Sequence, residues 1–211
     1  MGLNLVCFDL DGTLLRGVHS VMYLSILNGR LDELLEIERA EERGELDWIT
    51  ADYHKALLGR GLPEQAVEAR FLNTLTPIGG IGETVAALHR AGARCLILTA
   101  GPAQVARCAC RLWGMDGALG SVYPVENGCF TGEIAEHLGR RGKGAVLAEY
   151  CSGAGLDPAR CAAVGDGAAD VPMFRLCGCS VALNAGADVA AQATFSLHTS
   201  SLVDLLPLLL R

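Results

Sequence analysis

Short apolar runs that alternate with helical patterns are the feature that most constrains the fold of this chain. Four runs end in small or polar residues and match buried strands: residues 3–10, 93–99, 160–166 and 179–183. Three segments that flank these runs have helical patterns: residues 80–91, 102–113 and 143–151. A strand followed by a helix, repeated along the chain, predicts an α/β fold with a Rossmann-like parallel sheet and helices on both faces.

Residues 15–79 interrupt this alternation. They contain no convincing strand, and amphipathic stretches such as RLDELLEIERAEERGEL are rich in Glu and Arg. The segment predicts a helical cap inserted after the first strand, so that residues 1–14 and 80–211 form the α/β core. A second departure is SVYPVENGCFTGEI, in which Asn127 and Gly128 separate two β-prone runs and predict a hairpin.

Composition narrows the classes of partner. The 211 residues are 51% hydrophobic, which suffices for a substantial core, and the net charge is −7 without any basic run. Such a chain is a poor binder of nucleic acid or an anionic membrane. No apolar run reaches the roughly 20 residues of a membrane span, and the N-terminus lacks a signal-peptide pattern.

The number and positions of the cysteines indicate in which cellular compartment the protein is expected. Nine cysteines, an odd number with several inside apolar runs, favour reduced thiols and a cytoplasmic location. Two pairs are separated by one residue, Cys108 with Cys110 and Cys177 with Cys179. This spacing differs from that of zinc sites, so we interpret the cysteines as small buried hydrophobes.

Polar side chains follow three of the predicted strands. Asp9 and Asp11 follow the first strand, Thr99 ends the second, and Asp166 and Asp170 follow the third within GDGAAD. Ligands of open α/β sheets bind at the carboxyl ends of strands, where the strand order reverses. Two carboxylates at about 4 Å repel by roughly 4 kcal/mol at an effective dielectric near 20. A hard cation would relieve that repulsion, and Mg²⁺ prefers oxygen ligands.

The same strand ends carry the groups that phosphoryl transfer needs. A carboxylate can attack phosphorus and form an aspartyl-phosphate. Glycines let backbone N–H groups approach a phosphate, and Lys143, at the start of a predicted helix, can neutralise its charge. Each group alone has an ordinary structural explanation, such as a turn or a solvated lysine. Their joint occurrence, in order and at strand ends, predicts phosphoryl transfer.

These motifs resemble those of the haloacid dehalogenase superfamily phosphatases, and within it the phosphoserine phosphatase-like branch. FDLDGT, LILTAG, GKG and VGDGAADVPMF match the four family motifs in order, and the resemblance covers essentially the whole chain. The first and fourth motifs are specific together, whereas the second and third are weak alone. VENGCFTGEI and RGELDW also resemble this branch. The resemblance implies a phosphomonoesterase that depends on Mg²⁺.

The resemblance also implies a role for each matched residue. Asp9 would be the nucleophile that forms the aspartyl-phosphate. Asp11 would be the general acid that protonates the leaving oxygen, and afterwards the base that activates water. Thr99, the backbone of Ala100 and Lys143 would bind the phosphate oxygens. We expect the predicted cap to close over these groups, exclude water and select the leaving group.

A metal site is the second implication of the resemblance. Mg²⁺ would be bound by Asp9, the backbone carbonyl of Asp11, and Asp166. Asp170 would support this site from close by. The expected partner is therefore a small phosphorylated metabolite, together with the metal ion.

The chain departs from the phosphoserine phosphatases at three positions that contact substrate. Ala169 replaces an asparagine, Val18 replaces a glutamate that binds the ammonium group, and Tyr53 replaces an arginine that binds the carboxylate. We therefore expect phosphoserine to be a poor substrate and another small phosphate monoester to be the natural one. Possible substrate contacts in the predicted cap are Arg16, His19 and Tyr53, followed by Tyr23, Trp48 and His54.

Three alternatives stay open at this point. The chain could be a phosphoserine phosphatase with an unusual cap. It could be a phosphotransferase, because the same intermediate can pass its phosphoryl group to another alcohol. A non-catalytic phosphate-binding domain is disfavoured, because binding alone does not require both Asp9 and Asp11.

Overall fold

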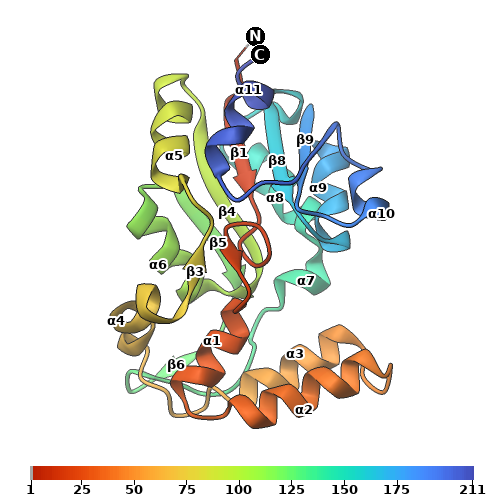
Figure 1. Cartoon of the computed structure of the whole chain (residues 1–211). Helices are drawn as coiled ribbons and strands as arrows, with labels where there is room; N and C mark the ends of the chain where they lie inside the picture. Colours follow the sequence, from red (N-terminus) through yellow and green to blue (C-terminus); the bar gives the residue numbers. More distant parts are fainter. Residues whose placement is uncertain (1) are drawn as a thin grey trace.

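A six-stranded parallel sheet forms the centre of the computed structural model, which describes residues 2–211 (Figure 1). The order is β10–β9–β8–β1–β4–β5. The strands are β1 (Leu5–Phe8), β4 (Arg94–Pro102), β5 (Gly117–Ser121), β8 (Cys161–Gly165), β9 (Cys179–Leu183) and β10 (Phe195–Leu197). The chain passes from β1 to β4 and β5, then continues on the other side of β1, so the strand order reverses there. This is the predicted Rossmann-like α/β fold.

Both faces of the sheet are covered by helices. Leu5 and Cys7 of β1 share one core with α8 (Lys143–Gly153) and α9 (Val171–Leu176). Val6 and Phe8 point the other way, into a core with α5 (Ile81–Arg90) and α6 (Ala103–Trp113). A strand buried on both faces is apolar at every position, which explains why LVCF reads as a continuous run.

Two strands of the sheet were not predicted. β10 has only three residues, and β5 has the sequence GALGS, which lacks β-branched residues. Close approach to β4 and α6 requires glycine at position 120 of β5 and leaves little room at position 117. A Cβ at Gly120 would lie 2.8 Å from the carbonyl oxygen of Gly101, and one at Gly117 would lie 3.1 Å from the Leu96 side chain. Tertiary packing therefore outweighs the poor strand propensity of this segment.

The segment 15–79, called the helical segment below, contains four helices: α1 (Ser20–Leu27), α2 (Leu31–Glu42), α3 (Trp48–Leu57) and α4 (Gln65–Thr74). Figure 1 shows α1, α2 and α3 beyond the carboxyl ends of the strands, opposite both termini. The expectation of no strand here is wrong at the two ends, where β2 (Leu15–Arg16) pairs antiparallel with β3 (Thr76–Pro77). This short pair holds together the two strands through which the chain enters and leaves the helical segment.

The hairpin predicted around Asn127 is confirmed. β6 (Val125–Glu126) and β7 (Cys129–Phe130) pair antiparallel. Asn127 and Gly128 both have positive φ, 49° and 79°, as a two-residue hairpin turn requires. Phe130 donates its backbone N–H to the Leu62 carbonyl at 2.9 Å, so the hairpin is joined to the helical segment.

The nine cysteines are free thiols, and five of them are buried: Cys7, Cys95, Cys108, Cys151 and Cys161. The buried ones take part in the two cores on either side of the sheet, as expected of small hydrophobes. Across residues 2–211, no helix has the length and apolar character needed to cross a bilayer.

Candidate active site

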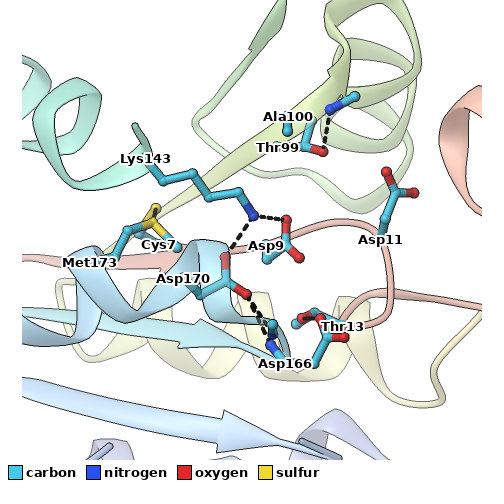
Figure 2. Close-up of polar contacts among 12 residues, drawn as sticks. Cys7, Asp9, Asp11, Thr13, Thr99, Ala100, Lys143, Asp166, Asp170 and Met173 are labelled. Carbon is cyan, nitrogen blue, oxygen red and sulfur yellow. Dashed lines mark hydrogen bonds and ion pairs between the residues drawn. The ribbon is translucent and has the colours of Figure 1, made fainter. Parts of the chain in front are cut away.

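The carboxyl ends of β1, β4 and β8 bring the predicted residues together (Figure 2). Asp9 directly follows β1, Thr99 lies within β4, and Asp166 directly follows β8. Lys143 is the first residue of α8, and Asp170 closes a short 3-10 turn before α9. We call these five residues the rim.

Lys143 connects two acids of the rim. Its Nζ donates to Oδ1 of Asp9 and to Oδ1 of Asp170, both at 2.6 Å. All three residues are buried, and Lys143 is only 5% exposed. Burial by itself lowers the pKa of a lysine, but the charges of Asp9 and Asp170 outweigh burial and hold the pKa of Lys143 above its usual value. The lysine is therefore a permanent positive charge beside Asp9.

Asp170 is fully engaged by the protein. While its Oδ1 accepts from Lys143, its Oδ2 accepts the backbone N–H groups of Asp166 and Gly167, both at 3.0 Å. A Cβ at Gly165 would lie 2.4 Å from this carboxyl group, so the approach requires glycine. This arrangement favours a supporting role in which Asp170 orients Lys143 and the Asp166 loop.

The acids of the rim fit a divalent cation. Asp9, Asp166 and Asp170 each offer a carboxylate oxygen, and these oxygens lie within 4.8 Å of one another. Burial raises the pKa of Asp9 well above its usual value despite the nearby Lys143 charge, and burial also raises the pKa of Asp166. Three carboxylates and one ammonium carry a formal charge of −2. An all-oxygen donor set with this charge suits Mg²⁺.

Thr13 and Gly12 hold Asp166 in place, and neither was singled out in the sequence. Thr13 Oγ1 donates to Asp166 Oδ1 at 2.7 Å. Gly12 has φ 86°, and a Cβ there would lie 2.2 Å from Asp166 Oδ2. Because both residues immediately follow Asp11 in the same turn, their position in FDLDGT was the available signal.

The predicted phosphate-binding residues of β4, Thr99 and Ala100, are held by hydrogen bonds within the strand and to β5. Thr99 is buried, and its Oγ1 accepts the backbone N–H of Gly101 at 3.0 Å. The Ala100 carbonyl accepts from Ser121 Oγ at 2.6 Å, and Ser121 Oγ in turn accepts the N–H of Leu138 at 2.9 Å. The carbonyl of Ala100 is thus turned toward β5.

Asp11 lies apart from the buried ion pairs, as Figure 2 shows. Its Oδ1 accepts the backbone N–H of Ser20 at 2.7 Å, and its Oδ2 accepts the Ser20 hydroxyl at 2.5 Å. Ser20 begins α1, the first helix of the helical segment. Nothing in the sequence indicated this contact, because a serine nine residues after Asp11 matches no motif.

The three predicted substrate contacts of the helical segment have other partners. Arg16 donates to the carbonyl of Thr199 at 3.2 Å. His19 caps α1 by accepting the Met22 N–H, and its Nε2 lies 2.6 Å from Glu38 Oε1. Tyr53 packs against the ring of His137, with centroids 5.6 Å apart. Within residues 2–211, none of the three side chains hydrogen-bonds to the rim or to Asp11.

Comparisons with known proteins identify the family of this chain. The family model of haloacid dehalogenase-like hydrolases matches residues 6–175. Phosphoserine phosphatase of Halobacterium salinarum is 33% identical over 206 residues, covering 97% of this chain and 95% of the relative. Phosphoserine phosphatase of Albidiferax ferrireducens is 30% identical over 211 residues, with 97% and 89% covered. A solved structure of a phospho-aspartyl intermediate analogue of phosphoserine phosphatase has a TM-score of 0.82, 25% identity and 99% coverage of both chains.

The family match includes the whole site. Residues 6–175 contain β4, β8 and all of β1 except Leu5, together with every predicted catalytic, phosphate-binding and metal-binding residue. The family match and the relatives confirm the predictions of the superfamily, its phosphoserine phosphatase-like branch, and an enzyme of the phosphomonoesterase class. The chain belongs to the haloacid dehalogenase-like hydrolases.

Proposed function

We propose that this enzyme hydrolyses a small phosphate monoester through an aspartyl-phosphate on Asp9, with Mg²⁺ as cofactor and phosphoserine as substrate. The observation that carries the chemistry is the buried arrangement of Asp9, Lys143, Asp166 and Asp170 at the strand-order reversal. In this proposal the helical segment acts as the cap over the core of residues 1–14 and 80–211.

The first half of the proposed reaction transfers the phosphoryl group. A carboxylate oxygen of Asp9 attacks phosphorus, the bond from phosphorus to the leaving oxygen breaks, and Asp11 donates its proton to that oxygen. Thr99, the Ala100 backbone and Lys143 bind the remaining phosphate oxygens. A magnesium ion held by Asp9, Asp166 and the Asp11 carbonyl would neutralise phosphate charge.

The second half regenerates the enzyme. Asp11, now ionised, removes a proton from water, and the water oxygen attacks phosphorus in the aspartyl-phosphate. Inorganic phosphate leaves, Asp9 returns to a carboxylate, and Asp11 is protonated again. In the free enzyme that this half-reaction restores, Lys143 is charged, because its two carboxylate partners stabilise the ammonium form.

The relatives favour phosphoserine as the substrate. Val18, Tyr53 and Ala169 had led us to expect that phosphoserine would be a poor one. Both curated relatives described above align over nearly their full length, and both bear the name of that activity. The helical segment also offers charges of both signs for a zwitterion. Lys55 is buried and bonds Glu41 at 2.8 Å, and a pocket of about 500 Å³ is lined by Lys55 with Glu38, Glu41 and Glu42.

One residue of the pocket lining, Glu38, is linked to Asp11 by hydrogen bonds. Glu38 bonds His19, and the next residue, Ser20, bonds the Asp11 carboxylate. Glu38 of α2 is therefore linked through two contacts and one peptide bond to the proposed general acid. We propose that Lys55 and these glutamates take the place of the missing substrate partners.

A phosphate-release screen tests the proposal. Phosphoserine, sugar phosphates, other phosphorylated metabolites and p-nitrophenyl phosphate are compared by kcat/KM, with Mg²⁺ and after chelation. We expect phosphoserine to exceed every other metabolite by at least about tenfold, because only the matched substrate pairs its buried charges. A higher kcat/KM for a sugar-like or aromatic phosphate monoester would contradict phosphoserine as the substrate. It would not contradict the proposed hydrolysis through an aspartyl-phosphate.

Two controls separate the alternatives. Asp9→Asn reports any contaminating phosphatase, because this variant lacks the proposed nucleophile but nearly keeps its shape. Added glycerol tests phosphotransfer: formation of glycerol phosphate at the expense of free phosphate would identify a transferase. Absence of phosphate release from every substrate would instead favour a non-catalytic domain.

A further inference from the structure

Ser20 contacts both oxygens of the Asp11 carboxylate. Its backbone N–H donates to Oδ1 at 2.7 Å, and its hydroxyl lies 2.5 Å from Oδ2. Ser20 is fully buried, so water does not compete for its hydroxyl. Hydrogen bonds to a charged group are stronger than those between neutral groups. The orientation of Asp11 is therefore set by this one residue.

The two contacts differ in what they permit chemically. A backbone N–H can only donate, so Oδ1 cannot carry a proton directed at Ser20. The Ser20 hydroxyl can donate to one lone pair of Oδ2 both when Asp11 is ionised and when Oδ2 carries its proton at the other lone-pair site, from which that proton can reach the leaving oxygen. The pair can thus keep its geometry while Asp11 loses and regains a proton, as the proposed reaction requires.

The approach between Ser20 and the end of β4 is close. A Cβ at Gly101 would lie 2.0 Å from the Ser20 hydroxyl and 3.0 Å from Asp11 Oδ2. Gly101 therefore leaves the space in which the Ser20 hydroxyl meets Asp11. An alanine at position 101 would displace this hydroxyl and crowd the Asp11 carboxylate, so it would disturb the contact from the β4 side.

Ser20 is positioned by the helical segment. It opens α1 directly after the cap residue His19, whose Nε2 pairs with Glu38 of α2. Tyr23 of α1 donates its hydroxyl to the Val67 carbonyl of α4 at 2.6 Å. The nucleophile Asp9 is held by the core through Lys143, whereas the side chain of Asp11 is held by a helix that α2 and α4 fix in place.

We infer that Ser20 is a positioning residue that holds the Asp11 side chain for proton transfer and couples its orientation to the helical segment. This inference rests on the proposed function, in which Asp11 is the general acid and base. It applies to the step that protonates the leaving oxygen. Substrates whose leaving group needs no protonation should therefore be nearly indifferent to Ser20.

The test compares two leaving groups in the Ser20→Ala variant. We expect kcat/KM to fall by about 10- to 100-fold both for phosphoserine and for ethyl phosphate, an alkyl phosphate without ammonium or carboxylate groups, the cost of losing one hydrogen bond to a charged group. A loss confined to phosphoserine would indicate altered substrate recognition and would contradict the inference. For p-nitrophenyl phosphate, kcat/KM should change by less than about threefold. This parameter reports only steps up to formation of the aspartyl-phosphate, so slow hydrolysis of the intermediate does not affect it.

Ser25→Ala is the matched control. Ser25 lies on the same helix and is also buried, but among residues 2–211 its hydroxyl bonds only the Val21 carbonyl, at 3.3 Å. We expect both activities of this variant to stay within about threefold of wild type. Gly101→Ala disturbs the contact between Ser20 and Asp11 from the side of β4, and it should also reproduce the selective loss on the alkyl phosphate.

Several results would overturn the inference. Equal loss on both substrates in Ser20→Ala would indicate a general structural role, and no loss on either would show that Asp11 needs no such support. If Ser20→Ala does not fold, the inference is tested by Gly101→Ala instead, through the ratio of its kcat/KM for the alkyl phosphate to that for p-nitrophenyl phosphate. Failure of the proposed function is distinct, because Asp9→Asn would then retain wild-type turnover or the wild type would release no phosphate.

Discussion

In the rim, Lys143 and its two carboxylate partners are buried, whereas on α2 the charged pairs such as Arg39 with Glu36 are exposed to solvent. Only one residue of α2, Leu34, is buried. Removing one partner of a buried pair costs about 3–5 kcal/mol, but exposed pairs contribute only about 0–1 kcal/mol. From this difference we expect substitutions in the rim to lower both the catalytic rate and the free energy of unfolding. Substitutions of charged residues in the helical segment should mainly change which substrate is preferred.

The largest effect is expected at the nucleophile. Asp9→Asn should lower kcat by about 10³-fold or more, as removal of nucleophiles does in other enzymes, because an amide oxygen is a poor nucleophile. Circular dichroism should show an intact fold. Phosphate release at a tenth of the wild-type rate or above would contradict the assignment of Asp9.

Metal removal should come next in size. Without a cation the acids of the rim repel the phosphate dianion, so chelation with EDTA should abolish turnover and Mg²⁺ should restore it. At 100 times its dissociation constant, Mg²⁺ should also stabilise the wild type by about 2.7 kcal/mol. In Asp166→Asn most of this stabilisation by Mg²⁺ should be lost, as measured by the change in melting temperature on adding the metal. Full activity after exhaustive chelation would exclude the proposed metal site.

Lys143→Ala tests the buried side of the comparison. The substitution leaves Asp9 and Asp170 buried without their partner, so unfolding by urea in EDTA should show a loss of about 3–5 kcal/mol. The control is Arg141→Ala, two residues earlier, whose exposed pairs with Glu136 and Glu149 predict a loss below about 1 kcal/mol. Similar losses of unfolding free energy in Lys143→Ala and Arg141→Ala would show that buried and exposed ion pairs of this protein contribute equally to stability.

Lys55→Ala tests the helical segment and should have the smallest effect. If Lys55 binds the substrate carboxylate, kcat/KM for phosphoserine should fall about tenfold, the cost of one charge-assisted contact. The value for p-nitrophenyl phosphate should stay within about threefold of wild type. Arg39→Ala, on the exposed face of α2, should leave both values unchanged. Equal losses on both substrates in Lys55→Ala would mean that the residue does not select the leaving group.

The residues of the rim could be predicted because each one depends on local pattern. A buried strand is a continuous apolar run, and Asp9 and Asp166 directly follow such runs. Lys143 starts a helix whose apolar residues are visible in the sequence. Parallel strands share one carboxyl edge, so residues distant in sequence were expected to meet there without knowledge of their contacts.

The helical segment could be predicted only as helices. Its amphipathic patterns indicated secondary structure, but the partners of Arg16, His19 and Tyr53 lie on other elements: Thr199, Glu38 and His137. A side chain at the surface of a short helix has several possible partners with similar energies. The crossing of the helices selects among them, and the sequence pattern does not specify that crossing.

The sequence by itself determined the α/β class, the positions of four strands and the catalytic motifs, because hydrophobic period and motif spacing are local properties. Only the tertiary structure decided that GALGS is a strand, that Thr13 supports Asp166, and that Ser20 holds Asp11. Each of these depends on how closely two separate segments of backbone approach. That approach is set by the packing of the whole core, which no short stretch of sequence encodes.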